Sequence, residues 1–316
     1  VILHKDGKTV TVSDNGRGIP VDIHPKHKKP AIEIILCTLH AGGKFEDGNY
    51  KTSGGLHGVG ASVVNALSKE LTATVKRDGK ESQMVFNRGV AKGKIKKLGK
   101  ARGTGTTITF HPDPTIFPRT EFNADTIRQR LEVASFLHKG VKISFDDQPS
   151  GNKDTFQHKD GITQYLEKII KERNARPIND GVFSLDKDNG TRIEAVLRWT
   201  ESTDEHVRSY VNGIPTGSGG THENGLRAGL TKAVRNYIDT HNLTPRGVKL
   251  THEDIREGLV MVLSVFIPDP QFQGQTKDRL NNPELTAAVD GAVRPALEHW
   301  LNHNSSVAES IVARII

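Results

Sequence analysis

The pattern of apolar and polar residues predicts several short β-strands in the first half of the chain. Val10-Thr11-Val12-Ser13 clearly shows the alternation of apolar and polar residues that is typical of a strand. The turn-forming pairs Asp6-Gly7 and Asp78-Gly79 each predict a hairpin between the strands that flank them. The strands expected in this half lie at residues 1–3, 10–13, 71–77, 82–87, 106–110 and 141–145.

Three segments of the same half show the period of an amphipathic helix. After Pro30, apolar side chains in residues 32–39 fall at i, i+3, i+4 and i+7, which predicts a helix over residues 31–40. Another helix is expected from Gly58 onward. A third should follow Asn123, whose side chain can cap its first turn.

The second half repeats the mixture of strands and helices. A helix at residues 162–173 and the polar stretch 174–180 mark the expected boundary, which divides the chain into domains 1–173 and 174–316. Because strands outnumber helices and hairpins adjoin one another, the pattern favours an α+β sandwich over an alternating parallel sheet. The elements expected beyond the boundary are strands at 181–185, 191–199, 206–212 and 260–267, a helix at 223–240, and helices from 283 onward.

Composition limits the class of protein. The 316 residues hold 34% apolar and 26% charged residues, and no run approaches the roughly 18–20 apolar residues of a membrane span. Cys37 is the only cysteine, so an intrachain disulfide is excluded, and a cytoplasmic location is expected. The net charge of +7 makes polyanions plausible partners. Because the chain starts at Val1 in an expected strand, we interpret it as a fragment whose natural N-terminus is missing.

The first candidate site is Asp14-Asn15-Gly16-Arg17-Gly18-Ile19-Pro20, which directly follows a predicted strand. A carboxylate at a strand end can accept a hydrogen bond from an exocyclic amine, and so can select adenine over guanine. Glycines beside it allow the backbone to approach a flat base. The same residues are also ordinary for a β-turn, so alone they leave both interpretations open.

The second candidate site is Gly54-Gly55-Leu56-His57-Gly58-Val59-Gly60, which leads into a predicted helix. The unpaired N–H groups of a helix's first turn suit phosphate, and glycines let the backbone wrap its oxygens. The segment lacks the Gly-Lys-Ser/Thr of a Walker loop and the spacing of a dinucleotide fingerprint. A flexible connector is the alternative. Lys44 precedes the segment and could meet phosphate, or be a solvated surface lysine.

Together and in this order, the two segments resemble the GHKL superfamily of ATPases, which includes gyrase, heat-shock chaperones, histidine kinases and mismatch-repair ATPases. Longer stretches narrow the resemblance to the B subunits of bacterial gyrase and topoisomerase IV, over the whole chain. It implies a GHKL-type two-layer α/β sandwich followed by a smaller α/β transducer domain. The stretches are Leu39-His40-Ala41-Gly42-Gly43-Lys44-Phe45, residues 53–60, Val63-Val64-Asn65-Ala66-Leu67-Ser68, Gly219-Gly220-Thr221-His222 and Gln275-Thr276-Lys277.

The resemblance implies roles for individual residues. Asp14 would read the adenine amine of ATP together with a bridging water, and Thr106 would assist it. Gln275 and Lys277 would reach the γ-phosphate, and Lys277 offers it a compact positive charge. The base pocket would be lined by Gly16, Ile19 and Pro20, and the phosphates would be held by Gly54, Gly55, Leu56, His57, Gly58, Val59 and Gly60.

The resemblance also implies what the chain lacks. In this family a water-activating Glu and a Mg²⁺-binding Asn lie on a helix just before the strand at which this chain starts. We therefore expect no metal ligand within the chain, and no turnover of ATP by it alone, since hydrolysis depends on positioning water. The N-terminal arm that family members exchange between subunits is likewise expected to be missing.

The partners implied are double-stranded DNA, the gyrase A subunit in an A2B2 heterotetramer, and a second copy of the B subunit in an ATP-dependent dimer. Arg227, on the helix after Gly219-Gly220-Thr221-His222, is the candidate DNA contact, through phosphate. The basic run at residues 92–102 is interpreted instead as a solvated hairpin end, because no aromatic residue is interleaved. The activity implied is ATP-driven negative supercoiling by gyrase. Decatenation by topoisomerase IV, a non-hydrolysing ATP sensor and a basic nucleic-acid-binding module remain alternatives.

Overall fold

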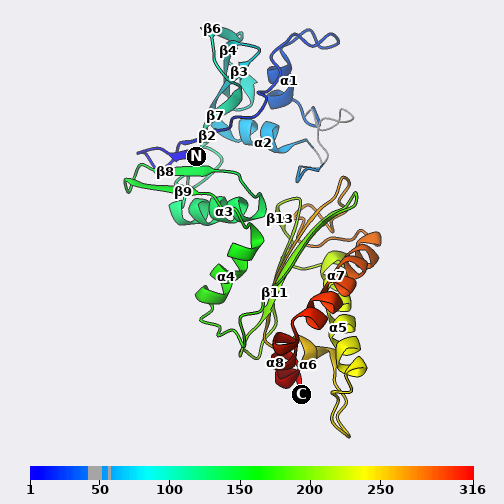
Figure 1. The fold of residues 1–316 in the computed structure, drawn as a ribbon. Coiled ribbons are helices and arrows are strands. Elements are labelled where there is room, and N and C mark those ends of the chain that lie inside the picture. Colours follow the sequence, from blue (N-terminus) through cyan, green and yellow to red (C-terminus); the bar gives the residue numbers. More distant parts are fainter. Residues whose placement is uncertain (42–51, 56–57) are drawn as a thin grey trace. The chain divides into compact units, whose positions relative to one another are not determined.

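The computed structural model describes residues 1–41, 52–55 and 58–316 of the chain (Figure 1). These residues form two compact units. The first unit contains the described residues of 1–50, 55–132 and 142–157. The second contains the described residues of 51–54 together with 133–141 and 158–316. Each unit has its own sheet and its own buried core.

The sheet of the first unit is mostly antiparallel and follows the order β5-β4-β3-β7-β2-β1-β8-β9, with β6 paired to β4. Both predicted hairpins are confirmed. Ile2 pairs with Thr11 in the first, and β3 pairs with β4 across Asp78 and Gly79, which both have the positive φ of a tight hairpin turn. The strands are β1 (Ile2–Leu3), β2 (Val10–Ser13), β3 (Ser68–Arg77), β4 (Lys80–Asn87), β5 (Val90–Ala91), β6 (Lys96–Lys100), β7 (Gly105–Pro112), β8 (Ile143–Asp147) and β9 (Asn152–Phe156).

Helix α1 (Ala31–Cys37) brings apolar side chains to this sheet, whereas the buried residues of α2 (Gly60–Ala66) are Ser62 and Asn65. Ile32 and Leu36 of α1 are buried against residues of β3 and β4. The predicted extent of the first helix was too long, because Thr38 is extended and Leu39 is 57% exposed. Cys37, its last residue, is exposed.

Helix α3 (Ala124–Leu137) starts as the sequence indicates, since the amide N–H of Thr126 donates to Asn123 Oδ1 over 2.9 Å. Its Ile127 and Leu131 pack with Leu3, Val10 and Phe145 in a second cluster of the first unit. Residues 96–100 of the basic run form β6, and all of them are exposed, as expected for a solvated hairpin end.

The sheet of the second unit follows the order β10-β11-β14-β12-β13, with only the β12–β14 pair parallel among the described strands. Central strand β14 is buried along both faces, which explains its unbroken apolar run. The strands are β10 (Phe183–Asp188), β11 (Arg192–Trp199), β12 (His206–Val211), β13 (Ile214–Pro215) and β14 (Leu259–Phe266).

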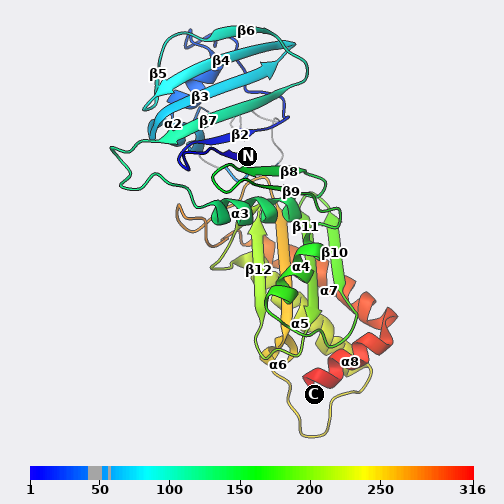
Figure 2. The ribbon, with the colours of Figure 1, turned by 90° about the vertical axis from the view of Figure 1, so that its left-hand side faces the viewer.

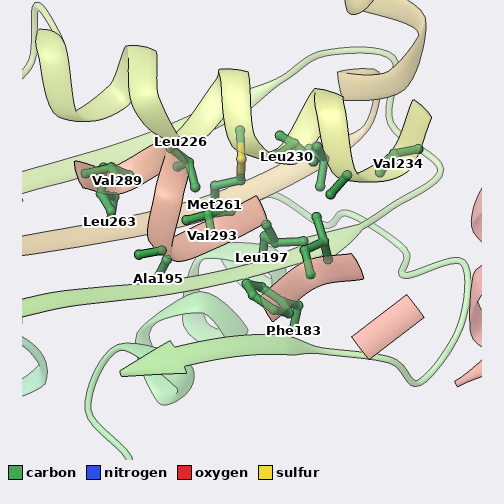
Figure 3. Packing of buried hydrophobic residues seen from close by; sticks show 14 of the residues in the cluster. Phe183, Ala195, Leu197, Leu226, Leu230, Val234, Met261, Leu263, Val289 and Val293 are labelled. Carbon is green, nitrogen blue, oxygen red and sulfur yellow. The ribbon is translucent and has the colours of Figure 1, made fainter. Parts of the chain in front are cut away.

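Helices cover both faces of this sheet. Leu226, Leu230 and Val234 of α5 (Thr221–Thr240) face β11 and β14 (Figure 3), and α7 (Glu284–His303) and α8 (Ser305–Ile315) join the same core. The short helix α6 (His252–Arg256) precedes β14. On the opposite face, α4 (Ile162–Glu172) packs with Val260 and Val262 (Figure 2).

Packing thus groups α4 with the second sheet, whereas the predicted domain boundary after residue 173 follows that helix. The boundary itself stays a prediction. Within the described residues, no helix combines the length and apolarity that crossing a bilayer requires.

Candidate functional site

The first unit orients the Asp14 carboxylate at the end of β2. The amide N–H of Asp14 donates to the carbonyl oxygen of Thr106 over 2.9 Å, which continues the β2–β7 pairing by one residue. Asp14 Oδ1 accepts hydrogen bonds from the amides of Gly16 (2.9 Å) and Thr106 (3.2 Å). Its other oxygen, Oδ2, accepts none from any residue that the structure describes. The exposed carboxylate is therefore fixed by one oxygen and presents the other.

Thr106, on strand β7, forms a hydrogen bond with the turn that follows Asp14. Its buried hydroxyl oxygen accepts a hydrogen bond from the amide of Ile19 over 3.1 Å. Ile19 is partly buried and packs on the α1–β3 core, while the next residue, Pro20, is exposed. Asp14, Gly16, Ile19 and Thr106, all predicted for one site, are thus brought together.

Two glycines permit this close packing. Gly18 has φ +82°, and a β-carbon there would lie 2.6 Å from the carbonyl oxygen of Lys76. A β-carbon on Gly105 would lie 2.1 Å from the carbonyl oxygen of Asp14. Arg77 also holds the turn, since its Nη1 donates to the carbonyl oxygen of Gly18 over 2.6 Å. Sequence reasoning missed Gly105 and Arg77, although the run Gly103-Thr104-Gly105 carries a visible turn signal.

Part of the glycine-rich segment belongs to the start of α2. Gly58 has φ +59°, and its carbonyl oxygen accepts from the amide of His40 over 3.2 Å. The helix begins at Gly60 rather than at the predicted Gly58, with Val59 preceding it and making no side-chain cap. Gly60 has open space where a β-carbon would lie. The predicted phosphate contacts Lys44, Leu56 and His57 lie outside the described residues.

The first residue of the glycine-rich segment, Gly54, belongs to the second unit. Asn212 Nδ2 donates to the carbonyl oxygens of Ser53 and Ile267, each over 2.9 Å. A β-carbon on Gly54 would lie 3.0 Å from the Ile214 side chain. Gly54 therefore lies against the β12–β13 hairpin, and Gly55, the next residue, is assigned to the first unit. Sequence reasoning missed Asn212, whose pairing with Gly213 is the available turn signal.

Lys277 reaches this part of the segment. Its Nζ donates to the carbonyl oxygen of Gly54 over 2.9 Å, and its backbone has the unusual φ of +58°. An ammonium on a backbone carbonyl can exchange that weak acceptor for a phosphate oxygen, because charge-assisted hydrogen bonds are stronger. Gln275, two residues earlier, is exposed.

Arg227, the predicted DNA contact, is held by two carboxylates. Its Nε donates to Glu205 Oε1 over 2.8 Å, and its Nη1 donates to Glu223 Oε2 over 2.9 Å. Contact with DNA phosphate stays a prediction for this side chain.

Comparison with known protein families gives a match to each half of the chain. Residues 1–116 match the family described as histidine kinase-, DNA gyrase B- and HSP90-like ATPase, and residues 161–316 match the family described as DNA gyrase B. The 43K ATPase domain of Thermus thermophilus gyrase B, solved with an aminocoumarin, superposes with a TM-score of 0.83 at 34% identity. That alignment covers 99% of this chain and 81% of the other.

Two longer relatives lead to the same family. The B subunit of DNA topoisomerase 4 from Salmonella typhimurium is 42% identical over 318 residues, and the B subunit of DNA gyrase from Archaeoglobus fulgidus is 41% identical over 320. Both alignments cover 100% of this chain, which spans about half of each relative's length (50%).

Fold and site define a GHKL-type ATPase sandwich followed by the second domain of a type II topoisomerase. The chain belongs to the family of DNA gyrase and topoisomerase IV B subunits. Both kinds of relative match at similar identity, so both assignments within the family fit.

Proposed function

We propose that this chain binds ATP in its first unit, where the Asp14 carboxylate accepts a hydrogen bond from the adenine amine. The observation that carries this proposal is the orientation of Asp14, whose Oδ1 is held by two backbone amides while Oδ2 has no partner among the described residues. An acceptor in this position favours adenine, which presents an amine where guanine presents a carbonyl oxygen. Gly16, Ile19 and Pro20 line the base in this proposal, and Thr106 holds both Asp14 and Ile19 in place.

The glycine-rich segment and Lys277 hold the phosphates in the same proposal. Gly54, Gly55, Gly58, Val59 and Gly60 supply backbone, together with Lys44, Leu56 and His57. Lys277 and Gln275 contact the γ-phosphate, and Lys277 exchanges the carbonyl oxygen of Gly54 for it. The support for this role is the 2.9 Å contact between Lys277 Nζ and that carbonyl oxygen.

Substitution of Asp14 tests the adenine assignment. In Asp14→Asn, one amide oxygen can still accept from Gly16 and Thr106, but an NH₂ group replaces the second acceptor. We expect ATP to bind about tenfold to a hundredfold more weakly, the cost of a hydrogen bond to a charged group, and the preference for ATP over GTP to shrink. Calorimetric titration measures both. Asp125→Asn, an exposed carboxylate of the same unit that pairs with Arg128 on α3, is the matched control. Unchanged ATP affinity in Asp14→Asn refutes the assignment.

We propose that the chain is the ATPase and transducer region of a gyrase B subunit. In this proposal the B subunit acts in the cytoplasm with the gyrase A subunit. ATP binding dimerises two B subunits around double-stranded DNA, and hydrolysis drives the passage of one duplex through another, giving negative supercoiling. Decatenation as part of topoisomerase IV is the second candidate, favoured by the 42% identity to the B subunit of that enzyme. Supercoiling and decatenation assays with each kind of A subunit distinguish the two.

Mg²⁺ is proposed as the counter-ion of the bound phosphates. No three His, Cys, Asp or Glu side chains gather at one point in the part of the chain that the structure describes, so we assign the ion no ligand there. The absence of turnover, expected from the resemblance, stays a prediction. A phosphate-release assay on the chain, with nucleotide binding measured in parallel, checks it.

A further inference from the structure

An ion pair chain joins α5 to the start of β12 in the second unit. Arg227 bridges Glu205 and Glu223, over 2.8 and 2.9 Å. The Glu223 side chain is only 11% exposed and that of Arg227 31% exposed. Charge-assisted hydrogen bonds in such partly buried sites are stronger than exposed surface pairs. The arrangement therefore fixes the position of the Glu223 carboxylate.

Glu223 in turn supports the loop at residues 216–220, which leads into α5. Its Oε1 accepts a hydrogen bond from Ser209 Oγ over 2.8 Å, and Ser209 Oγ lies 2.7 Å from Thr216 Oγ1. A β-carbon on Gly219 would lie 2.7 Å from Glu223 Oε2, so the loop backbone packs directly on the carboxylate. Both oxygens of Glu223 thus constrain this loop.

The loop is paired with the residues that follow Lys277. The amide of Ser218 donates to the carbonyl oxygen of Asp278 over 2.9 Å, and the amide of Leu280 donates to the carbonyl oxygen of Gly219 over 3.1 Å. Arg279 adds a third contact, from its Nη1 to the carbonyl oxygen of Ser218 over 3.1 Å. The conformation of the loop therefore determines where the backbone carrying Lys277 runs.

We propose that Arg227 and Glu223 are positioning residues for Lys277. The ion pair holds the loop, the loop holds residues 278–280, and Lys277 is thereby kept in the left-handed conformation in which its ammonium reaches the carbonyl oxygen of Gly54. The inference rests on the proposed function, in which Lys277 contacts the γ-phosphate. It makes the second unit's response to the γ-phosphate depend on two side chains that do not themselves touch nucleotide.

The test compares the affinities for ADP and for the non-hydrolysable analogue AMPPNP, which differ by the terminal phosphoryl group. We expect Arg227→Gln and Glu223→Gln to weaken AMPPNP binding about threefold to thirtyfold, as is typical of residues that act through another group, and to leave ADP binding unchanged. Arg227→Lys keeps the charge but loses the planar guanidinium whose Nε and Nη1 reach the two carboxylates, so its effect on AMPPNP binding should be intermediate. Lys232→Gln is the matched control, because Lys232 lies on the same helix and pairs with Asp290 away from the loop.

A double substitution separates this inference from the function on which it rests. If Arg227 acts through Lys277, Arg227→Gln has no further effect on the ratio of the two affinities in a Lys277→Ala background. If Lys277→Ala leaves the ratio at the wild-type value, the proposed role of Lys277 fails. If Lys277→Ala lowers the ratio of AMPPNP affinity to ADP affinity and Arg227→Gln does not, the positioning role alone is overturned.

Hydrogen exchange tests the positioning role without nucleotide. Arg227→Gln should speed amide exchange in peptides covering residues 216–222 and 275–281, whereas Lys232→Gln should not. Wild-type exchange in residues 275–281 of Arg227→Gln overturns the inference. So does a loss of duplex DNA affinity in Arg227→Gln with an unchanged nucleotide ratio, which would make this side chain a DNA contact instead.

Discussion

At the scale of single residues, Gly18 shows how backbone geometry supports the candidate site. Its φ of +82° lies in the region that disfavours a β-carbon, and the Lys76 carbonyl oxygen occupies the space where one would be. The left-handed conformation alone costs a residue with a β-carbon about 1–2 kcal/mol, and we expect Gly18→Ala to destabilise the first unit by more than this. We also expect it to abolish tight ATP binding, because the turn after Asp14 must move. Thermal unfolding by circular dichroism and calorimetric titration measure the two effects.

Gly79→Ala is the control for strain alone. Gly79 has φ +72° in the same unit, and no atom lies within 4 Å of its added β-carbon. If Gly18→Ala proves as stable as Gly79→Ala and binds ATP normally, the close approach of Gly18 is unimportant.

His222 predicts a pH dependence for the second unit. Burial lowers the pKa of His222 to about 4. Between pH 6.5 and pH 4 the unfolded chain takes up a proton at this residue that the folded chain does not. The free energy of unfolding should therefore fall as the pH drops through this window, by about 3 kcal/mol at most. His222→Gln, which cannot titrate, should show a shallower loss.

Urea unfolding at pH 7 and pH 5, followed by tryptophan fluorescence, checks this expectation. Trp199 and Trp300 are the only tryptophans of the sequence and both lie in the second unit with His222. An equal loss in wild type and His222→Gln would show that burial of this imidazole has no such effect.

The sequence revealed the residues with distinctive chemistry and missed those that act by shape. Asp14 and Thr106 were predicted for one site and share a hydrogen bond. Gly105 was missed because its role depends on a strand more than 90 positions away, which no local pattern specifies. Glu223 read as an ordinary helix residue, and only the packing shows its oxygens against Ser209 and Gly219.

At the scale of elements, glycines on α5 allow close contact with α7. A β-carbon on Gly225 would lie 2.5 Å from the carbonyl oxygen of Thr286 and 2.9 Å from Val289 Cβ. Gly225→Ala should therefore destabilise the second unit by about 1–3 kcal/mol through overpacking, although alanine is the better helix former. Urea unfolding followed by tryptophan fluorescence measures the change.

Gly291, on α7, provides the opposite case. It is exposed and has no atom within 4 Å of an added β-carbon. Gly291→Ala should stabilise the same unit by about 1 kcal/mol from helix propensity alone. Stabilisation by Gly225→Ala as well as by Gly291→Ala would contradict the assigned contact between α5 and α7.

Element types were predicted better than their ends or their partners. The hairpin of β3 and β4 followed from Asp78-Gly79, and β14 from its apolar run. The end of α1 was missed because Leu39 falls at the helical spacing from the apolar residues before it. The backbone nevertheless leaves the helix at Thr38, which has an extended conformation. The parallel pairing of β12 with β14 joins strands about 50 residues apart, so local periodicity carries no sign of it.

At the scale of the whole molecule, the separate cores predict separate responses to nucleotide. Each buried cluster of the described residues lies within one unit. ADP has no γ-phosphate, so in the proposed function it engages the first unit without Lys277. At a hundredfold excess over its dissociation constant it should stabilise that unit by about 2.7 kcal/mol and leave the tryptophan-monitored transition in place.

AMPPNP should raise both transitions, because it adds the contact with Lys277. Thermal unfolding followed in parallel by far-ultraviolet circular dichroism and tryptophan fluorescence makes the comparison. An equal shift of the fluorescence transition with ADP would show that nucleotide engages the second unit without the contact between Lys277 and the γ-phosphate.

The exposed Cys37 at the end of α1 gives the molecule a single attachment point for an optical reporter. It is the sole thiol of the sequence and lies in the first unit, whereas both indoles lie in the second. A dye attached to this thiol can accept excitation energy from the tryptophans, so the native chain supplies the donors in one unit and the attachment point for the acceptor in the other. Nucleotide-driven rearrangement can then be followed as a change in transfer efficiency, in real time and without a single substitution.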